Sequence, residues 1–142
     1  MTPGATDIRV VRRHLTALRR VLDELARHTG KPVEALSDWD ELRVVERALQ
    51  LCAQNALDIA THLAAGAGHD VADYASAIDS LADLGILDRA FTANFRSVAG
   101  FRNILVHGYL EVDLGILHSV LNTRLTEFTS FADTVEGHLA NL

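Results

Sequence analysis

The apolar residues of this sequence follow long seams in which successive hydrophobic side chains are three or four positions apart. The longest seam begins at Leu42, ends at Leu63 and continues for about 22 residues. Residues at these intervals lie on one face of an α-helix, whereas a half-buried strand alternates with a period of two. No segment shows that alternation over a sustained length between turn residues. The sequence therefore predicts an all-α protein.

Five helices are expected from these seams and from the residues that can begin or end a helix. Glycine ends a helix readily, and an aspartate or serine in front of a seam can cap its first turn. The expected helices run from about Asp7 to His28, from Ser37 or Asp38 to about Gly66, from about Asp73 to Leu84, from Asp88 to His107, and from Val112 or Asp113 to about Leu139. Long seams suit antiparallel neighbours. We predict an up-and-down bundle of about five helices that forms a single domain over residues 1–142.

The composition places the chain among globular proteins. Its 142 residues are 49% hydrophobic, and no uncharged apolar run approaches the ~20 residues that span a bilayer. The first fifteen residues carry charges and no apolar core of a signal peptide. The expectation is a cytoplasmic protein with no membrane contact.

Small residues occupy part of the longest seam and the positions beside it. Cys52, the only cysteine, excludes an internal disulfide and is expected to be an inert buried thiol. Four alanines near it would allow close approach of another helix, either within the chain or from a second copy. They are Ala53, Ala56, Ala60 and Ala64.

The charge is distributed unevenly along the chain. The formal net charge is -6, but residues 1–31 hold seven basic and three acidic side chains. An overall negative charge argues against nonspecific coating of nucleic acid, because Lys and Arg supply most of that affinity. The first helix could face RNA or an acidic partner, or its arginines could simply be solvated. The sequence leaves these alternatives open.

The stretch from Phe101 to Tyr109 concentrates polar chemistry in an otherwise apolar segment. Arg102, Asn103, His107 and Tyr109 all fall within these nine residues. In a helix, Asn103 and His107 share a face, while Arg102 continues the apolar seam that precedes it. A charge on a buried seam is costly unless it is paired or lines a wet cleft. Arg102 could reach solvent or pair with a nearby carboxylate, Glu111 or Asp113, but the four residues together favour a functional site.

The spacing Arg102, four residues, His107, one residue, Tyr109, with Asn103 beside the arginine, resembles the motif of the HEPN superfamily. The likeness is specifically to HepT-like toxins, and it covers almost the whole chain. The other matching segments are Glu46–Gln50, Leu57–Ala60, Leu84–Leu87, Gly100–Asn103 and Glu111–Asp113. The resemblance implies a HEPN-like bundle.

The resemblance also implies a metal-independent endoribonuclease that needs no cofactor. Its catalytic residues would be Arg102, His107 and Asn103, in a cleft completed by a homodimer, and Tyr109 would contact the RNA substrate. The chemistry suits the residues, since an imidazole exchanges protons near neutrality and a guanidinium binds phosphate oxygens bidentately. Two symmetry-related histidines could serve as base and acid.

A regulatory partner follows from the same resemblance. HepT-like proteins are the toxin half of a type VII-like toxin–antitoxin pair whose antitoxin is a minimal nucleotidyltransferase. This implies AMP addition to Tyr109, where bulk and negative charge beside Arg102 and His107 would block the cleft.

Two alternative interpretations of the sequence concern a metal site and a noncatalytic role. Asp58 with His62, and His69 with Asp73, have helical four-residue spacing, but neither pair forms a recognised ligand set, so no metal site is expected. The main alternative is a noncatalytic helical partner subunit of a minimal nucleotidyltransferase, in which the same residues bind nucleotide or phosphate without cleaving RNA.

Overall fold

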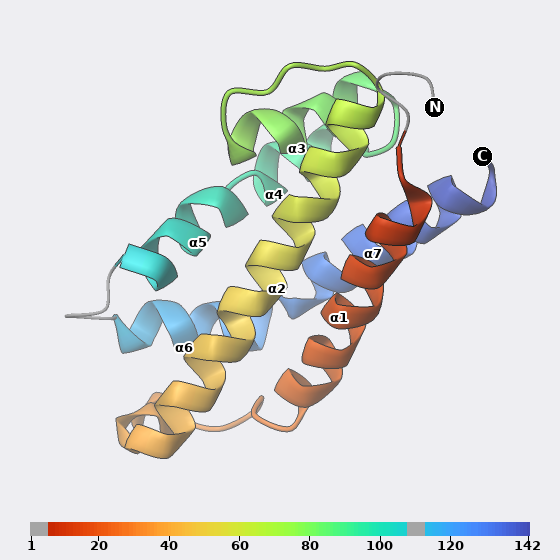
Figure 1. Ribbon diagram of the computed structural model, residues 1–142. Helices are drawn as coiled ribbons and strands as arrows, with labels where there is room; N and C mark the ends of the chain where they lie inside the picture. Colours follow the sequence, from red (N-terminus) through yellow and green to blue (C-terminus); the bar gives the residue numbers. More distant parts are fainter. Residues whose placement is uncertain (1–5, 108–112) are drawn as a thin grey trace.

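The structure, a computed structural model, describes residues 6–107 and 113–142, and every regular element in these ranges is helical. The elements are α1 (Ile8–Ala26), the short 3-10 helix η1 (Val33–Ser37), α2 (Trp39–Gly66), α3 (Tyr74–Asp83), α4 (Arg89–Phe95), α5 (Val98–His107), α6 (Leu114–Thr123) and α7 (Leu125–Ala140). The expected all-α bundle is confirmed (Figure 1).

Aspartate caps begin five of these helices. A carboxylate that accepts from a backbone N–H of the first turn satisfies a donor that the helix itself leaves unpaired. The caps are Asp7 to Arg9 N at 3.0 Å, Asp38 to Glu41 N at 3.0 Å, Asp73 to Ser76 N at 2.8 Å, Asp88 to Phe91 N at 3.1 Å, and Asp113 to Gly115 N at 2.8 Å. The starts expected from the sequence are therefore confirmed, with Asp38 rather than Ser37 capping α2.

Helix α2 is the central element of the bundle. It packs against α1 on one side and against α3 and α5 on the other (Figure 1). Eleven of its residues are buried, which is more than one amphipathic stripe provides. Ala53, Ala56, Ala60 and Ala64 are all fully buried, so neighbouring helices of the same chain account for their small size. Cys52 is buried as well, and this burial raises the pKa of its thiol to about 12.

Two of the five expected helices are each divided in two. The fourth expected helix breaks after Phe95, where Ser97 Oγ donates to the Asn94 carbonyl at 3.0 Å. Just beyond, Ala99 N donates to Arg96 O at 3.2 Å, three residues back, whereas an α-helical N–H donates four residues back. Neither of the turn residues, Arg96 and Ser97, is a glycine or proline, so the sequence carries no obvious sign of this break.

The last expected helix breaks at Arg124, whose backbone has φ -119° and ψ -2°. Its side chain donates to Glu127 at 2.7 Å and to the Asn94 carbonyl at 3.3 Å, and Asn94 Nδ2 donates to Glu127 at 2.9 Å. The two breaks are thus tied to each other. The residues described therefore hold seven α-helices where about five were expected.

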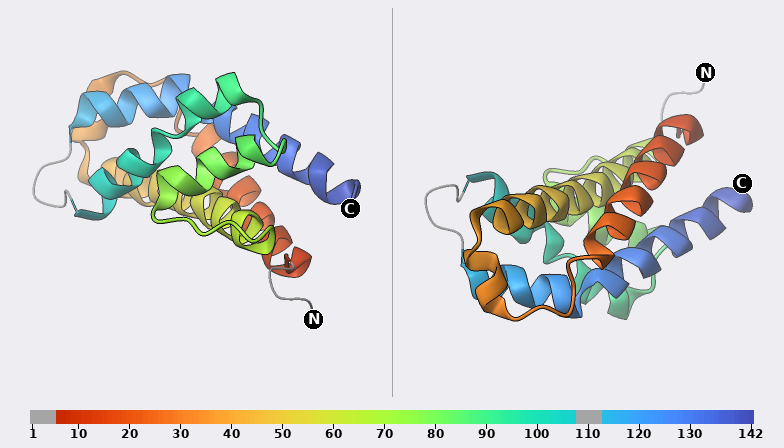
Figure 2. Two further views of the ribbon diagram at one scale, coloured as in Figure 1. Left: turned by 90° about the horizontal axis from the view of Figure 1, so that it is seen from above. Right: turned by 90° about the horizontal axis from the view of Figure 1, so that it is seen from below.

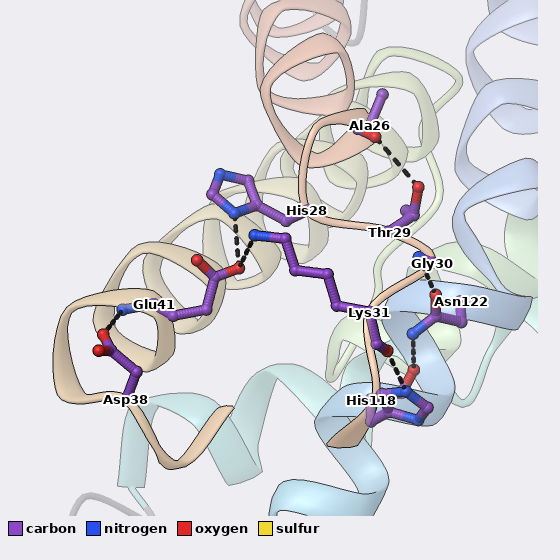
Figure 3. Close-up of polar contacts among 9 residues, drawn as sticks. All are labelled: Ala26, His28, Thr29, Gly30, Lys31, Asp38, Glu41, His118 and Asn122. Carbon is purple, nitrogen blue, oxygen red and sulfur yellow. Dashed lines mark hydrogen bonds and ion pairs between the residues drawn. The ribbon is translucent and has the colours of Figure 1, made fainter. Parts of the chain in front are cut away.

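The connection between α1 and α2 is fixed to α6 (Figure 3). Gly30, in the left-handed region at φ +79°, donates its N–H to Asn122 Oδ1 at 2.8 Å. His118 Nε2 lies 2.9 Å from the Lys31 carbonyl, and the Lys31 ammonium lies 3.0 Å from a Glu41 carboxylate oxygen. The contacts of Gly30 and Lys31 with Asn122 and His118 hold α6 against the connection and η1, and α7 continues from α6 beside α1 (Figure 2).

Within the described residues, none of the helices combines the length and the apolar composition that crossing a membrane requires.

Candidate active site

Arg102 lies half-buried on α5 and faces α2 and α3. Its Nε donates to Gln54 Oε1 of α2 at 2.9 Å, and its guanidinium carbon lies 5.3 Å from the centre of the Tyr74 ring at the start of α3. A guanidinium at this distance over an aromatic face is attracted by the ring quadrupole. The arginine on the apolar seam therefore has a specific place between three helices.

No ion pair involves Arg102 among the described residues. Of its two expected carboxylate partners, Asp113 caps α6 through Gly115 and Ile116, and Glu111 lies outside the described residues. A neutral amide and an aromatic ring surround the cation instead. Its positive charge is therefore available to an anionic ligand.

The Gln54 amide is engaged at each of its polar positions. Its oxygen accepts from Arg102, and its nitrogen donates to Asp58 Oδ1 at 2.9 Å and lies 3.3 Å from the Tyr74 hydroxyl. On the other side of the guanidinium, Arg102 Nη1 donates to Asn103 Oδ1 at 3.1 Å. Gln54, Asp58, Tyr74 and Arg102 form a connected polar cluster, called here the Arg102 cluster.

Asn103 and His107 are exposed on α5; the Asn103 side chain still accepts from Arg102, and His107 lies on a different side of the helix from Arg102. Each helical residue advances about 100° around the axis, so His107 points about 140° away from Arg102 and Asn103 about 100°. Ile104, about 60° farther around the helix than His107, is 44% exposed although it is apolar. One chain therefore presents its arginine and its histidine on different sides of the same helix.

Tyr109, the expected contact for RNA and the expected site of modification, lies outside the described residues. Its role stays a prediction.

Sequence reasoning missed Gln54 and the contact between Tyr74 and Arg102. Gln54 is 48 positions from Arg102, so their hydrogen bond depends on how α5 packs against α2. The one local signal was the four-residue spacing of Gln54 and Asp58, which permits the bond along α2.

The residues weighed for a metal site have other contacts. Asp58 accepts from Gln54, Asp73 caps α3, and His69 Nδ1 lies 3.2 Å from Ser80 Oγ. His62 lies beside His14 of α1, with 5.8 Å between ring centres. Within residues 6–107 and 113–142, no three His, Cys, Asp or Glu side chains gather in a metal-binding group.

The described residues form an all-α bundle that carries an arginine and a histidine five positions apart on one helix, as the resemblance to the HEPN superfamily implied. The chain belongs to the ribonuclease HepT-like family, which matches residues 14–135. The expected family is therefore confirmed, and so is its enzyme class, that of an endoribonuclease.

Two curated relatives and one solved structure are similar to this chain, and the solved structure supports the fold alone. The chain is 25% identical to the mRNA nuclease HepT of Shewanella oneidensis over 126 residues, which cover 87% of this chain and 93% of the relative. It is 24% identical to the tRNA nuclease HepT of Aphanizomenon flos-aquae over 136 residues, which cover 94% and 92%. A solved structure of a tri-AMPylated HEPN toxin of Shewanella oneidensis with MNT antitoxin has a TM-score of 0.80 at 22% identity, covering 90% of this chain and 97% of that one.

Proposed function

We propose that this protein is the ribonuclease toxin of a toxin–antitoxin pair and that it cleaves RNA without a metal ion. The observation that carries the proposal is the placement of Arg102, a half-buried guanidinium without a carboxylate counter-ion among the described residues, on the helix that ends in His107. A cation kept free of counter-ions suits a phosphate ligand.

The reaction follows from these groups. One imidazole accepts the proton of a ribose 2′-hydroxyl, and the oxygen attacks the adjacent phosphorus. The bond from phosphorus to the 5′-oxygen breaks, and that oxygen takes a proton from an imidazolium. The products are a 2′,3′-cyclic phosphate and a 5′-hydroxyl. Arg102 binds the phosphate oxygens as negative charge builds in the transition state.

A homodimer supplies what one chain lacks. Arg102 faces the interior of the bundle whereas His107 faces outward, and base and acid are most simply two imidazoles. A second copy laid across Asn103, Ile104 and His107 would cover the exposed apolar side chain and bring both histidines to one phosphate. Ile104→Glu should then give monomers in sedimentation and lose activity, and an active monomer would contradict the dimeric site.

Control by a nucleotidyltransferase antitoxin completes the proposal. A structurally similar Shewanella toxin is described as tri-AMPylated and bound to MNT antitoxin. AMP addition to Tyr109, two residues after His107, would place negative phosphate and bulk where RNA must enter. Intact-mass and peptide analysis after co-expression with the antitoxin tests this, and AMP found only on other residues would refute the assignment.

The deciding experiment is cleavage of total cellular RNA by protein purified without its partner, in the presence of EDTA. Wild type should release cyclic phosphate ends, His107→Ala should lose at least about 100-fold in rate, as expected for a general acid or base, and His62→Ala should cut normally. His62 is a suitable control because it is also an exposed helical histidine. If wild type and His107→Ala are equally inert and neither carries AMP, the protein is a noncatalytic subunit of the nucleotidyltransferase.

A further inference from the structure

We propose that Gln54 is a positioning residue for Arg102: it fixes the guanidinium without neutralising it, and Asp58 and Tyr74 hold Gln54 in the required orientation. The inference rests on the proposed function and extends it to residues outside the motif on α5.

The orientation of the Gln54 amide is determined by its neighbours. An ionised carboxylate only accepts hydrogen bonds, so Asp58 Oδ1, 2.9 Å away, requires the amide nitrogen on its side. The amide oxygen must then face Arg102 Nε, which it meets at 2.9 Å. The second N–H of the amide points to the Tyr74 hydroxyl at 3.3 Å. The reverse orientation would place two acceptors at Asp58 and two donors at Arg102.

The chemistry of the contact leaves the charge of Arg102 intact. A carboxylate in place of the Gln54 amide would form an ion pair with the guanidinium and compete with phosphate. The ring of Tyr74 also holds the guanidinium by its face, with 5.3 Å between the guanidinium carbon and the ring centre, and consumes none of its donors. Both contacts position the cation and preserve its affinity for anions.

Donors remain for the substrate. An arginine has five N–H groups, of which Nε donates to Gln54 and one on Nη1 donates to Asn103. Three N–H groups, one on Nη1 and two on Nη2, have no hydrogen-bond partner among the described residues. Two neighbouring donors suffice for bidentate contact with a phosphate.

The test compares Gln54→Ala with Asn55→Ala, both alone and combined with Arg102→Ala. Asn55 is a matched control because it is also a half-buried amide of α2, with hydrogen bonds to His14 at 2.9 Å and to the Leu51 carbonyl at 2.8 Å. Gln54→Ala should lower kcat about 10-fold to 100-fold through misplacement of the guanidinium, and Asn55→Ala should leave kcat near that of wild type. In the Arg102→Ala background, Gln54→Ala should cost nothing more, because it acts only through Arg102.

Gln54→Glu supplies a readout that a purely structural role would not move. The new carboxylate would pair with Arg102, so binding of a 2′-O-methyl RNA that cannot be cleaved should weaken. The slope of log Kd against log salt concentration should also become smaller, by about the contribution of one phosphate contact. Gln54→Met, which keeps the length of the side chain, should bind with the salt dependence of wild type. Thermal unfolding of each variant shows whether it is folded.

The outcomes separate the two claims. Loss of kcat in Gln54→Ala but not in Asn55→Ala, absent from the Arg102→Ala background, supports the positioning role. Equal effects of Gln54→Ala and Asn55→Ala while Arg102→Ala is strongly impaired but still measurable overturn it and leave the proposed function standing. An Arg102→Ala variant that cleaves and binds RNA like wild type overturns both claims, as does a wild type that neither binds nor cuts RNA.

Discussion

Phe95, the last residue of α4, offers a direct test of how α4 is anchored on α7. Its side chain is 1% exposed, stacks at 5.0 Å on both Phe91 and Phe131, and meets Phe128 edge-on at 5.5 Å. Truncating a fully buried phenylalanine to alanine costs about 3–5 kcal/mol. Each aromatic pair adds about 0.5–1.5 kcal/mol beyond burial. Three such pairs place Phe95→Ala near the upper end, at about 4–5 kcal/mol.

Such a loss is a large part of the total stability, because domains of this size unfold with about 5–15 kcal/mol. With an m of about 2 kcal/mol/M, the urea midpoint should fall by about 2 M. The assay is urea unfolding followed by circular dichroism at one protomer concentration, since association would shift the midpoint.

Phe91→Ala is the matched control for this prediction. Phe91 is on the same helix, only half-buried, and its one aromatic contact among the described residues is with Phe95. The control should lose less than half of what Phe95→Ala loses. Equal losses in the two variants would refute the conclusion that the packing of Phe95 against α7 anchors this part of the bundle.

Other substitutions and probes test separate features. Gly30→Ala should destabilise the fold by about 1–2 kcal/mol in thermal unfolding, because alanine is strained at φ +79°. No atom lies within 4 Å of an added Cβ, so this backbone strain is the whole cost. The helical Gly137→Ala should instead stabilise the fold by about 0.5–1 kcal/mol. Cys52, with a pKa of about 12, should resist iodoacetamide at pH 8 until urea unfolds the chain, and rapid labelling in the folded state would contradict its burial. The hydrogen bond from His28, followed by that from Lys31, lowers the pKa of Glu41. The carboxylate therefore stabilises the fold above the unfolded pKa of about 4.3 and loses this effect as the pH falls through the lower folded pKa; Glu41→Gln should be less stable than wild type at pH 6 and approach it in acid.

The sequence predicted those features of the fold that depend on residues close together in the chain. Apolar residues spaced three and four positions apart predicted the helices, and aspartates in front of these seams predicted where α2 and α4 begin. The breaks after Phe95 and at Arg124 were not predictable, because they depend on Asn94, Arg124 and Glu127 meeting across 30 or more positions. Local periodicity does not contain such contacts.

The site divides in the same way. Arg102, Asn103 and His107 could be proposed as candidates from their spacing, and Arg102 was conspicuous as a charge on an apolar seam; their roles stay predictions. The sequence could not indicate that the partners of Arg102 are Gln54 and Tyr74 rather than a carboxylate. An amide on a long helix has many possible partners, and its orientation toward Arg102 is decided by Asp58 on the same helix.

Helix α5 shows why the proposed site needs support from both sides. It has ten residues, of which three are buried, and isolated helices of that length are marginal in water. The helix begins three residues after Phe95, whose side chain packs against α7, and the Arg102 cluster holds one side of the helix. The opposite side, with Asn103, Ile104 and His107, is exposed. A second protomer on that side would therefore do more than contribute an imidazole: it would stabilise the helix that fixes the distance between the histidine and the arginine. Assembly of such a dimer and order within α5 would then be thermodynamically coupled, because each favours the other.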